Sequence, residues 1–66
     1  MRIIKTYHDD LDNPELITQR QSIECLEDRG FYKPGSVKDW MNELSANRMQ
    51  DFSVRTMTAS FEFKRK

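Results

Sequence analysis

The chain has 66 residues, of which 11 are basic and 11 acidic, so its formal net charge at pH 7 is zero. This length excludes a second domain, a stack of repeats or a large nucleotide-binding fold. The balanced charge excludes a uniformly basic nucleic-acid coat. A single cysteine excludes an internal disulfide framework, and no apolar run approaches the roughly 20 residues of a membrane span. We therefore expect one small cytoplasmic domain that occupies residues 1–66 and makes no contact with a membrane.

The first predicted element is a strand over residues 2–7, which are rich in β-branched and aromatic side chains. The run His8–Asp12 follows and is the one cluster of metal-ligand types in the chain. Its spacing does not fit a calcium-binding EF-hand loop, because Pro14 and Gln21 stand where that loop has liganding residues. The acids favour the N-terminus of a following helix electrostatically, so we expect no metal site.

A helix is predicted over residues 14–29. Asn13 followed by Pro14 is typical of a helix start, because asparagine accepts a bond from an early backbone N–H and proline has none to leave unpaired. Gly30 can end this helix in the left-handed conformation. The apolar residues that share one face of the helix are Leu16, Ile23 and Leu26.

A second helix is predicted over residues 37–48. Pro34–Gly35 is typical of a turn, and Ser36 is the expected N-cap. The clearest helical periodicity of the chain follows, with apolar residues at spacings of three, four and seven. We place this face, which consists of Val37, Trp40, Met41 and Leu44, in the core.

Residues 52–64 are strand-like, but the alternation of apolar side chains changes parity at Arg55–Thr56. No glycine, proline or asparagine lies in this segment. We therefore interpret the change as a bulge in one long strand and not as a tight hairpin. The order β-α-α-β predicts an α+β fold in which two helices pack on a short sheet.

The residue types of enzyme active sites are scarce in this sequence. His8 is the sole histidine, and Cys25 falls in the middle of a predicted helix, away from the helix N-terminus that would activate a thiol. With two glycines the chain cannot form a glycine-rich phosphate loop. We therefore expect no catalytic residues, no cofactor and a non-catalytic protein that binds other proteins, as a regulator or inhibitor of a larger partner.

Aromatic and basic residues outside the predicted core are the candidate partner-binding residues. Aromatic side chains dominate the energetics of protein interfaces, and a basic terminus favours an anionic surface. Nucleic acid is the alternative partner, although the asymmetry of charge between the two halves of the chain is mild. The candidates are Tyr32, Arg55, Lys64, Arg65 and Lys66.

The predicted C-terminal strand also indicates a homodimer. Residues 52–64 form a longer strand than residues 2–7 can pair with, and a two-stranded sheet is marginal in water. An exposed strand edge is a template for another chain, and a two-fold dimer is the commonest oligomer. The expected interface residues are Met57, Thr58, Ala59, Phe61 and Phe63.

The order of one strand followed by two helices, over residues 2–48, resembles that of ribbon-helix-helix proteins. This resemblance implies a nucleic-acid-binding regulator that reads the major groove with an antiparallel ribbon. The chain departs from that pattern because the acidic run Asp9–Asp12 would repel phosphate, and because residues 2–7 have no purely polar face. Protein binding is therefore the favoured function, and the nucleic-acid-binding regulator is the alternative.

Overall fold

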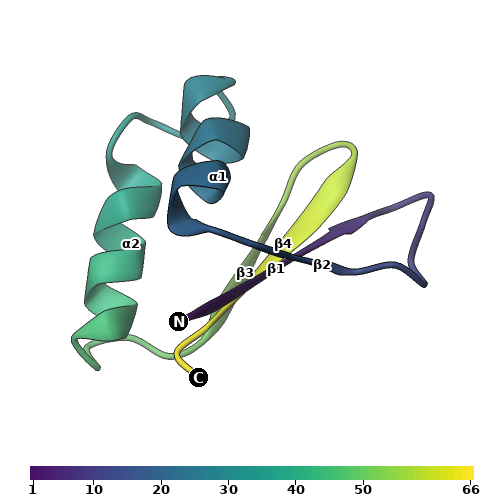
Figure 1. Cartoon of the computed structure of the whole chain (residues 1–66). Coiled ribbons are helices and arrows are strands. Elements are labelled where there is room, and N and C mark those ends of the chain that lie inside the picture. The colour runs from purple at the N-terminus through teal and green to yellow at the C-terminus, as the bar shows by residue number, and fades with distance from the viewer.

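A computed structural model describes residues 1–66 as an antiparallel sheet of four strands in the order β2-β1-β4-β3, with the helical segments on one face (Figure 1). This arrangement confirms the predicted α+β class. The strands are β1 (Arg2–Tyr7), β2 (Glu15–Ile17), β3 (Phe52–Arg55) and β4 (Ala59–Lys64). The helical segments are α1 (Gln19–Ile23), its π-helical continuation η1 (Glu24–Asp28), and α2 (Ser36–Ser45).

The first helix begins later than the sequence predicts. Strand β2 occupies the predicted first turn and pairs with β1, so that Ile17 lies opposite Ile3. Thr18 caps the helix instead of Asn13, in a reciprocal arrangement with Gln21. The Gln21 backbone N–H donates to Thr18 Oγ1 at 3.1 Å, and the Thr18 N–H donates to Gln21 Oε1 at 2.8 Å. The prediction for Asn13 was therefore wrong, whereas Gly30 does adopt the left-handed conformation at φ 83°.

The C-terminal segment is a hairpin, so the predicted single bulged strand was wrong. β3 and β4 pair antiparallel, with Val54 opposite Phe61. The Thr56 backbone N–H donates to the Ala59 carbonyl at 2.8 Å, and Thr56 Oγ1 accepts the Ala59 N–H at 3.2 Å. A threonine hydroxyl thus supplies the hydrogen bond that closes the turn without a glycine. The parity change at Arg55–Thr56 marks this turn, and β4 becomes an interior strand between β1 and β3.

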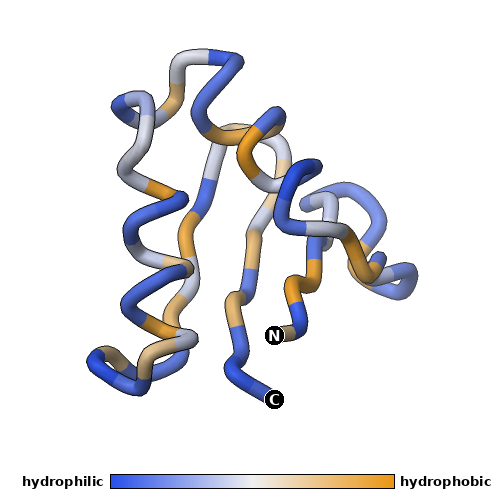
Figure 2. The backbone as a smooth tube through the Cα atoms, turned by 60° about the vertical axis from the view of Figure 1, so that its left-hand side comes forward, coloured by the Kyte–Doolittle hydropathy of each residue, from blue (hydrophilic) through white to orange (hydrophobic).

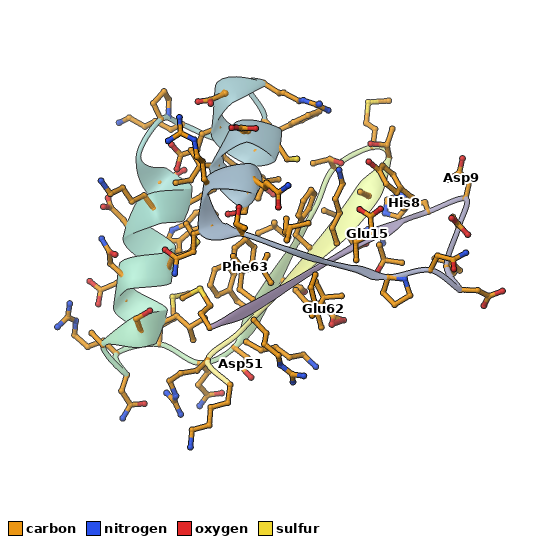
Figure 3. The ribbon with its side chains drawn as sticks, viewed as in Figure 1. His8, Asp9, Glu15, Asp51, Glu62 and Phe63 are labelled. Atoms are coloured by element: carbon orange, nitrogen blue, oxygen red, sulfur yellow. The ribbon has the colours of Figure 1, made fainter.

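The core lies between the helices and the face of the sheet that they cover. In Figure 2 the hydrophobic parts of α2 lie on the side of the helix that faces the sheet. Figure 3 shows Phe63 pointing toward the helices and Glu62 pointing away from them. The predicted core face of the second helix is confirmed, with Trp40 half-buried at its margin. The buried apolar residues are Ile3, Leu26, Val37, Met41, Leu44, Ala59, Phe61 and Phe63.

The buried carboxylate of Glu27 in η1 caps helix α2. The Gly35 backbone N–H donates to Glu27 Oε1 at 2.6 Å, and the Lys38 N–H donates to Oε2 at 3.0 Å. The predicted cap, Ser36, instead donates its hydroxyl to the Lys33 carbonyl at 2.6 Å. The bonds from Gly35 and Lys38 hold the pKa of Glu27 below its ordinary value, although burial of the carboxyl acts in the opposite direction. Glu27 therefore joins the two helices as an ionised acceptor.

We expect Glu27→Gln to lower the free energy of unfolding by about 2 kcal/mol at neutral pH, because a neutral amide is a weaker acceptor for buried N–H groups. The pKa of Glu27 is lowered in the folded state. Its contribution is therefore complete above the unfolded-state pKa of about 4.3 and is lost as the pH falls through the lower folded-state pKa. Urea unfolding at neutral pH and at about pH 2 measures this difference, which shrinks in acid.

The control for this prediction is Glu24→Gln, one turn earlier, where the side chain is exposed and pairs only with Arg20. We expect that change to alter stability by less than about 0.5 kcal/mol. An equal loss in both variants would contradict the assignment of Glu27 as the cap of α2.

Candidate protein-binding edge

Strand β3 is an edge of the sheet with an unpaired side. Hydrogen-bonded and non-hydrogen-bonded residue pairs alternate along an antiparallel ladder. Thr56 is hydrogen-bonded to Ala59, so the backbone N–H and C=O groups of Arg55 and Ser53 point away from β4. These groups lie at the free edge, where they offer a template for another strand.

Two of the predicted partner-binding residues, Tyr32 and Arg55, meet at this edge. The Tyr32 hydroxyl donates to the Arg55 backbone carbonyl at 3.5 Å, which is consistent with a carbonyl that points outward. Tyr32 also contacts Trp40 edge-to-face, with ring centroids 5.4 Å apart. Trp40 contacts Phe52 in the same manner at 5.9 Å, and Phe52 stacks on Phe63 at 4.6 Å. This aromatic row supports β3 from the edge to the core.

The other three predicted partner-binding residues, Lys64, Arg65 and Lys66, lie at the opposite end of β3 from Arg55, near both chain ends. Lys64 Nζ is 3.9 Å from a Glu62 carboxylate oxygen. The Arg65 backbone N–H donates to Asp51 Oδ1 at 3.0 Å, and the Arg65 guanidinium donates to the Asn47 side-chain oxygen. Of these three residues, Arg65 lines a groove of about 610 Å³, together with residues 47–51. Acidic and amide oxygens thus lie among the basic groups, so this end is not a bare cationic surface.

The predicted dimer residues are divided between the core and the tip of the hairpin. Ala59, Phe61 and Phe63 are 1%, 1% and 0% exposed, and their strand is paired on both sides. They therefore cannot form the expected interface, because no edge of β4 is free and their side chains fill the core. Met57 and Thr58 lie in the turn, where Met57 is 90% exposed. The free edge belongs instead to β3, whose residue Ser53 the sequence analysis did not select.

His8 lies at the far end of the sheet from Asp51 (Figure 3). Its Nε2 is 3.0 Å from Ser60 Oγ, and its backbone N–H donates to the Thr58 carbonyl at 2.9 Å. A depression of about 390 Å³ here is lined by Tyr7, His8, Asp9, Met57 and Thr58. No group of three His, Cys, Asp or Glu side chains is placed to hold a metal ion, and His8 has no acidic side chain as a hydrogen-bond partner.

Lys5 lies between the sheet and the first helix and contacts the sole cysteine. Its Nζ is 2.8 Å from the Tyr7 hydroxyl and 3.7 Å from Cys25 Sγ. Burial lowers the pKa of Lys5, but the hydrogen bond to Tyr7 and the nearby Cys25 together raise that pKa above its ordinary value. The ammonium also lies over the Tyr7 ring, 4.4 Å from its centroid. Lys5 is thus a packing residue that keeps its charge next to Cys25.

The topology differs from a ribbon-helix-helix arrangement. In that arrangement the first strand pairs with the same strand of another chain to form the ribbon that reads DNA. Here β1 is paired with β2 on one side and with β4 on the other, so that Ile4 lies between Leu16 and Glu62. The first strand therefore has no free edge for an intermolecular ribbon.

Comparison with known proteins gives no matching family model, no matching curated protein and no matching solved structure. Neither α1 nor α2 is long and apolar enough to cross a membrane.

Substitution of Phe61 and Met57 tests the assignment of Phe61 to the core and of Met57 to the surface. We expect Phe61→Ala to lower the free energy of unfolding by about 3–5 kcal/mol, because it leaves a cavity among buried neighbours. Met57→Ala removes an exposed side chain, so its effect should stay within about 0.5 kcal/mol. Urea unfolding of both variants at one low protein concentration measures the two values. A mild effect of Phe61→Ala would show that this side chain lies outside the core.

Proposed function

We propose that this chain is a small, non-catalytic binding protein that acts through protein–protein contacts at the free edge of β3 and forms a homodimer there. The observation that supports this proposal is the outward direction of the backbone groups of Ser53 and Arg55. An added strand gains main-chain hydrogen bonds at such an edge, while side chains on its two faces give specificity.

The β3 edge carries only part of the protection that proteins usually give a sheet edge, namely the charged side chain of Arg55 and the Tyr32 hydroxyl that donates to the Arg55 carbonyl. The stronger forms of protection are lysine or proline in the strand, or a bulge. The sequence Phe52–Arg55 contains neither lysine nor proline and pairs without interruption with β4. The opposite edge, β2, has three residues and directly follows the loop that contains Asp9, Asp10 and Asp12. β3 is therefore the edge that favours pairing.

A second copy of this chain fits the β3 edge by symmetry. Antiparallel pairing of β3 with the same strand of a partner joins the two sheets about a two-fold axis, and both pairs of helices then lie on one face of the joined sheet. A larger protein that offers an exposed strand would compete for the same backbone groups. Dissociation of the dimer would then be coupled to partner binding, which is the basis of a regulatory or inhibitory role.

Ser53→Pro tests the proposed edge. Proline removes an N–H that faces away from β4, so the hairpin keeps its hydrogen bonds, while the ring obstructs an incoming strand. We expect the wild-type chain to sediment as a dimer at micromolar concentrations and Ser53→Pro to sediment as a monomer with an unchanged far-UV circular dichroism spectrum.

Ser53→Ala is the matched control and should remain a dimer, because alanine keeps the backbone N–H. A wild-type chain that stays monomeric at about 100 μM would have a dimer dissociation constant above that concentration, which is too high for a working homodimer. This result would refute the proposed homodimer.

A further inference from the structure

A two-fold dimer at β3 has a small number of allowed registers, because the outward-facing residues must lie opposite one another. These registers are centred on Ser53, on Val54 or on Arg55. We infer that the dimer is centred on Ser53, which places Arg55 of each protomer opposite Asp51 of its partner. This inference rests on the proposed homodimer and specifies how its two chains recognise each other.

The charges along β3 select this register. Arg55 and Asp51 are both exposed and lie two residues on either side of Ser53. A register centred on Arg55 would place two guanidinium groups directly opposite each other, which is destabilising. A register centred on Val54 would place each Arg55 opposite an uncharged Ser53. The register centred on Ser53 forms two symmetry-related ion pairs and places the two serine hydroxyl groups together.

Neither Arg55 nor Asp51 is engaged in an ion pair within its own protomer, so both are available for pairing across the dimer axis. The three ion pairs inside the chain are Arg20–Glu24, Arg48–Glu43 and Lys64–Glu62, and none of them includes Arg55 or Asp51. The Arg65 backbone N–H donates to Asp51 Oδ1 and orients this carboxylate at the end of the sheet (Figure 3). The Asp51 Oδ2 atom has no hydrogen-bond partner within the chain, so a guanidinium from another protomer can reach it.

In the same register, the apolar side chains on the helix-covered face of β3 lie opposite apolar side chains of the partner strand. Phe52 of one protomer lies opposite Val54 of its partner, and the converse pair repeats across the axis. Both residues are half-buried in the monomer and pack against the core. Within each protomer, Phe52 lies opposite Phe63, and Val54 opposite Phe61. The apolar row of the sheet therefore continues across the axis as aromatic and β-branched pairs.

Charge exchange between chains tests the ion pairs. In the Arg55→Asp homodimer, each new carboxylate lies opposite Asp51 of the partner, so two pairs of negative charges face each other. In the Asp51→Arg homodimer, each new guanidinium lies opposite Arg55 of the partner, so two pairs of positive charges face each other. We expect each variant alone to raise the dimer dissociation constant by about tenfold or more. An equimolar mixture should recover dimerisation, because the mixed dimer contains two pairs of opposite charge. Sedimentation of each variant and of the mixture measures the recovery.

The control for charge exchange is Arg20→Asp on the first helix, which changes the net charge equally but lies away from β3. This variant should dimerise as the wild type does. Single variants of Arg55 and Asp51 that dimerise normally, or a mixture that does not recover, would overturn the register centred on Ser53.

Cross-linking gives a second measurement of the register, in a Cys25→Ser background. Directly opposite residues of a hydrogen-bonded pair have Cα atoms about 5.5 Å apart, which a disulfide can span. Ser53→Cys should therefore form a covalent dimer on mild oxidation. Arg55→Cys should not, because its counterpart lies four residues further along the partner strand, at least about 13 Å away.

The outcomes separate this inference from the proposed function. Cross-linking of Arg55→Cys alone would place the axis at Arg55. Cross-linking confined to a mixture of the Ser53→Cys and Arg55→Cys chains would place it at Val54. Either result, with a wild-type dimer, overturns the inferred register and leaves the dimer in place. A wild-type monomer in sedimentation overturns both the register and the dimer.

Discussion

The hydrogen bonds from the N-terminus of α2 to the Glu27 carboxylate hold the helices in the position on which the β3 edge depends. Gly35 and Lys38 donate these bonds, so the start of α2 is fixed to the end of the first helical segment. One turn into α2, Trp40 contacts Phe52 and thereby supports β3 from beneath. A carboxylate in η1 thus sets the placement of an edge strand that follows it by about two dozen residues of sequence.

The fold was predictable where local chemistry decides it. The spacing of Val37, Met41 and Leu44 places one face of α2 in the core, and Gly30 takes the left-handed conformation that a helix end favours. The start of the first helix was mispredicted because Asn13 and Pro14 satisfy local capping rules, whereas pairing of residues 15–17 with β1 is a long-range interaction. Tertiary pairing overrides a local signal in such cases. The hairpin was missed because a Thr56 hydroxyl replaces the usual glycine chemistry.

The candidate site was predictable in its residue types and not in its geometry. Tyr32 and Arg55 are a half-buried aromatic residue and an exposed charged residue, both of the kind that interfaces use, and they meet at the β3 edge. Ser53 carries no such signal, since its contribution is a backbone N–H and C=O whose direction depends on the alternation along the ladder. The sequence alone does not distinguish whether the apolar residues Phe61 and Phe63 belong to the core or to an interface. The position of β3 next to β4 places them in the core, because it makes β4 an interior strand.

A sheet edge that stays open for pairing at Ser53 has a physical consequence in so small a chain. A domain of this size buries only about 60% of the surface of its unfolded chain and is marginally stable. Proline at position 53 would protect the edge without breaking the β3–β4 ladder, because the Ser53 N–H makes no bond to β4. The fold therefore does not require the open edge. A partner strand that pairs there stabilises the folded state by an amount that grows with the logarithm of its concentration once this exceeds the dissociation constant. The folding of this chain is thereby coupled to the presence of what it binds.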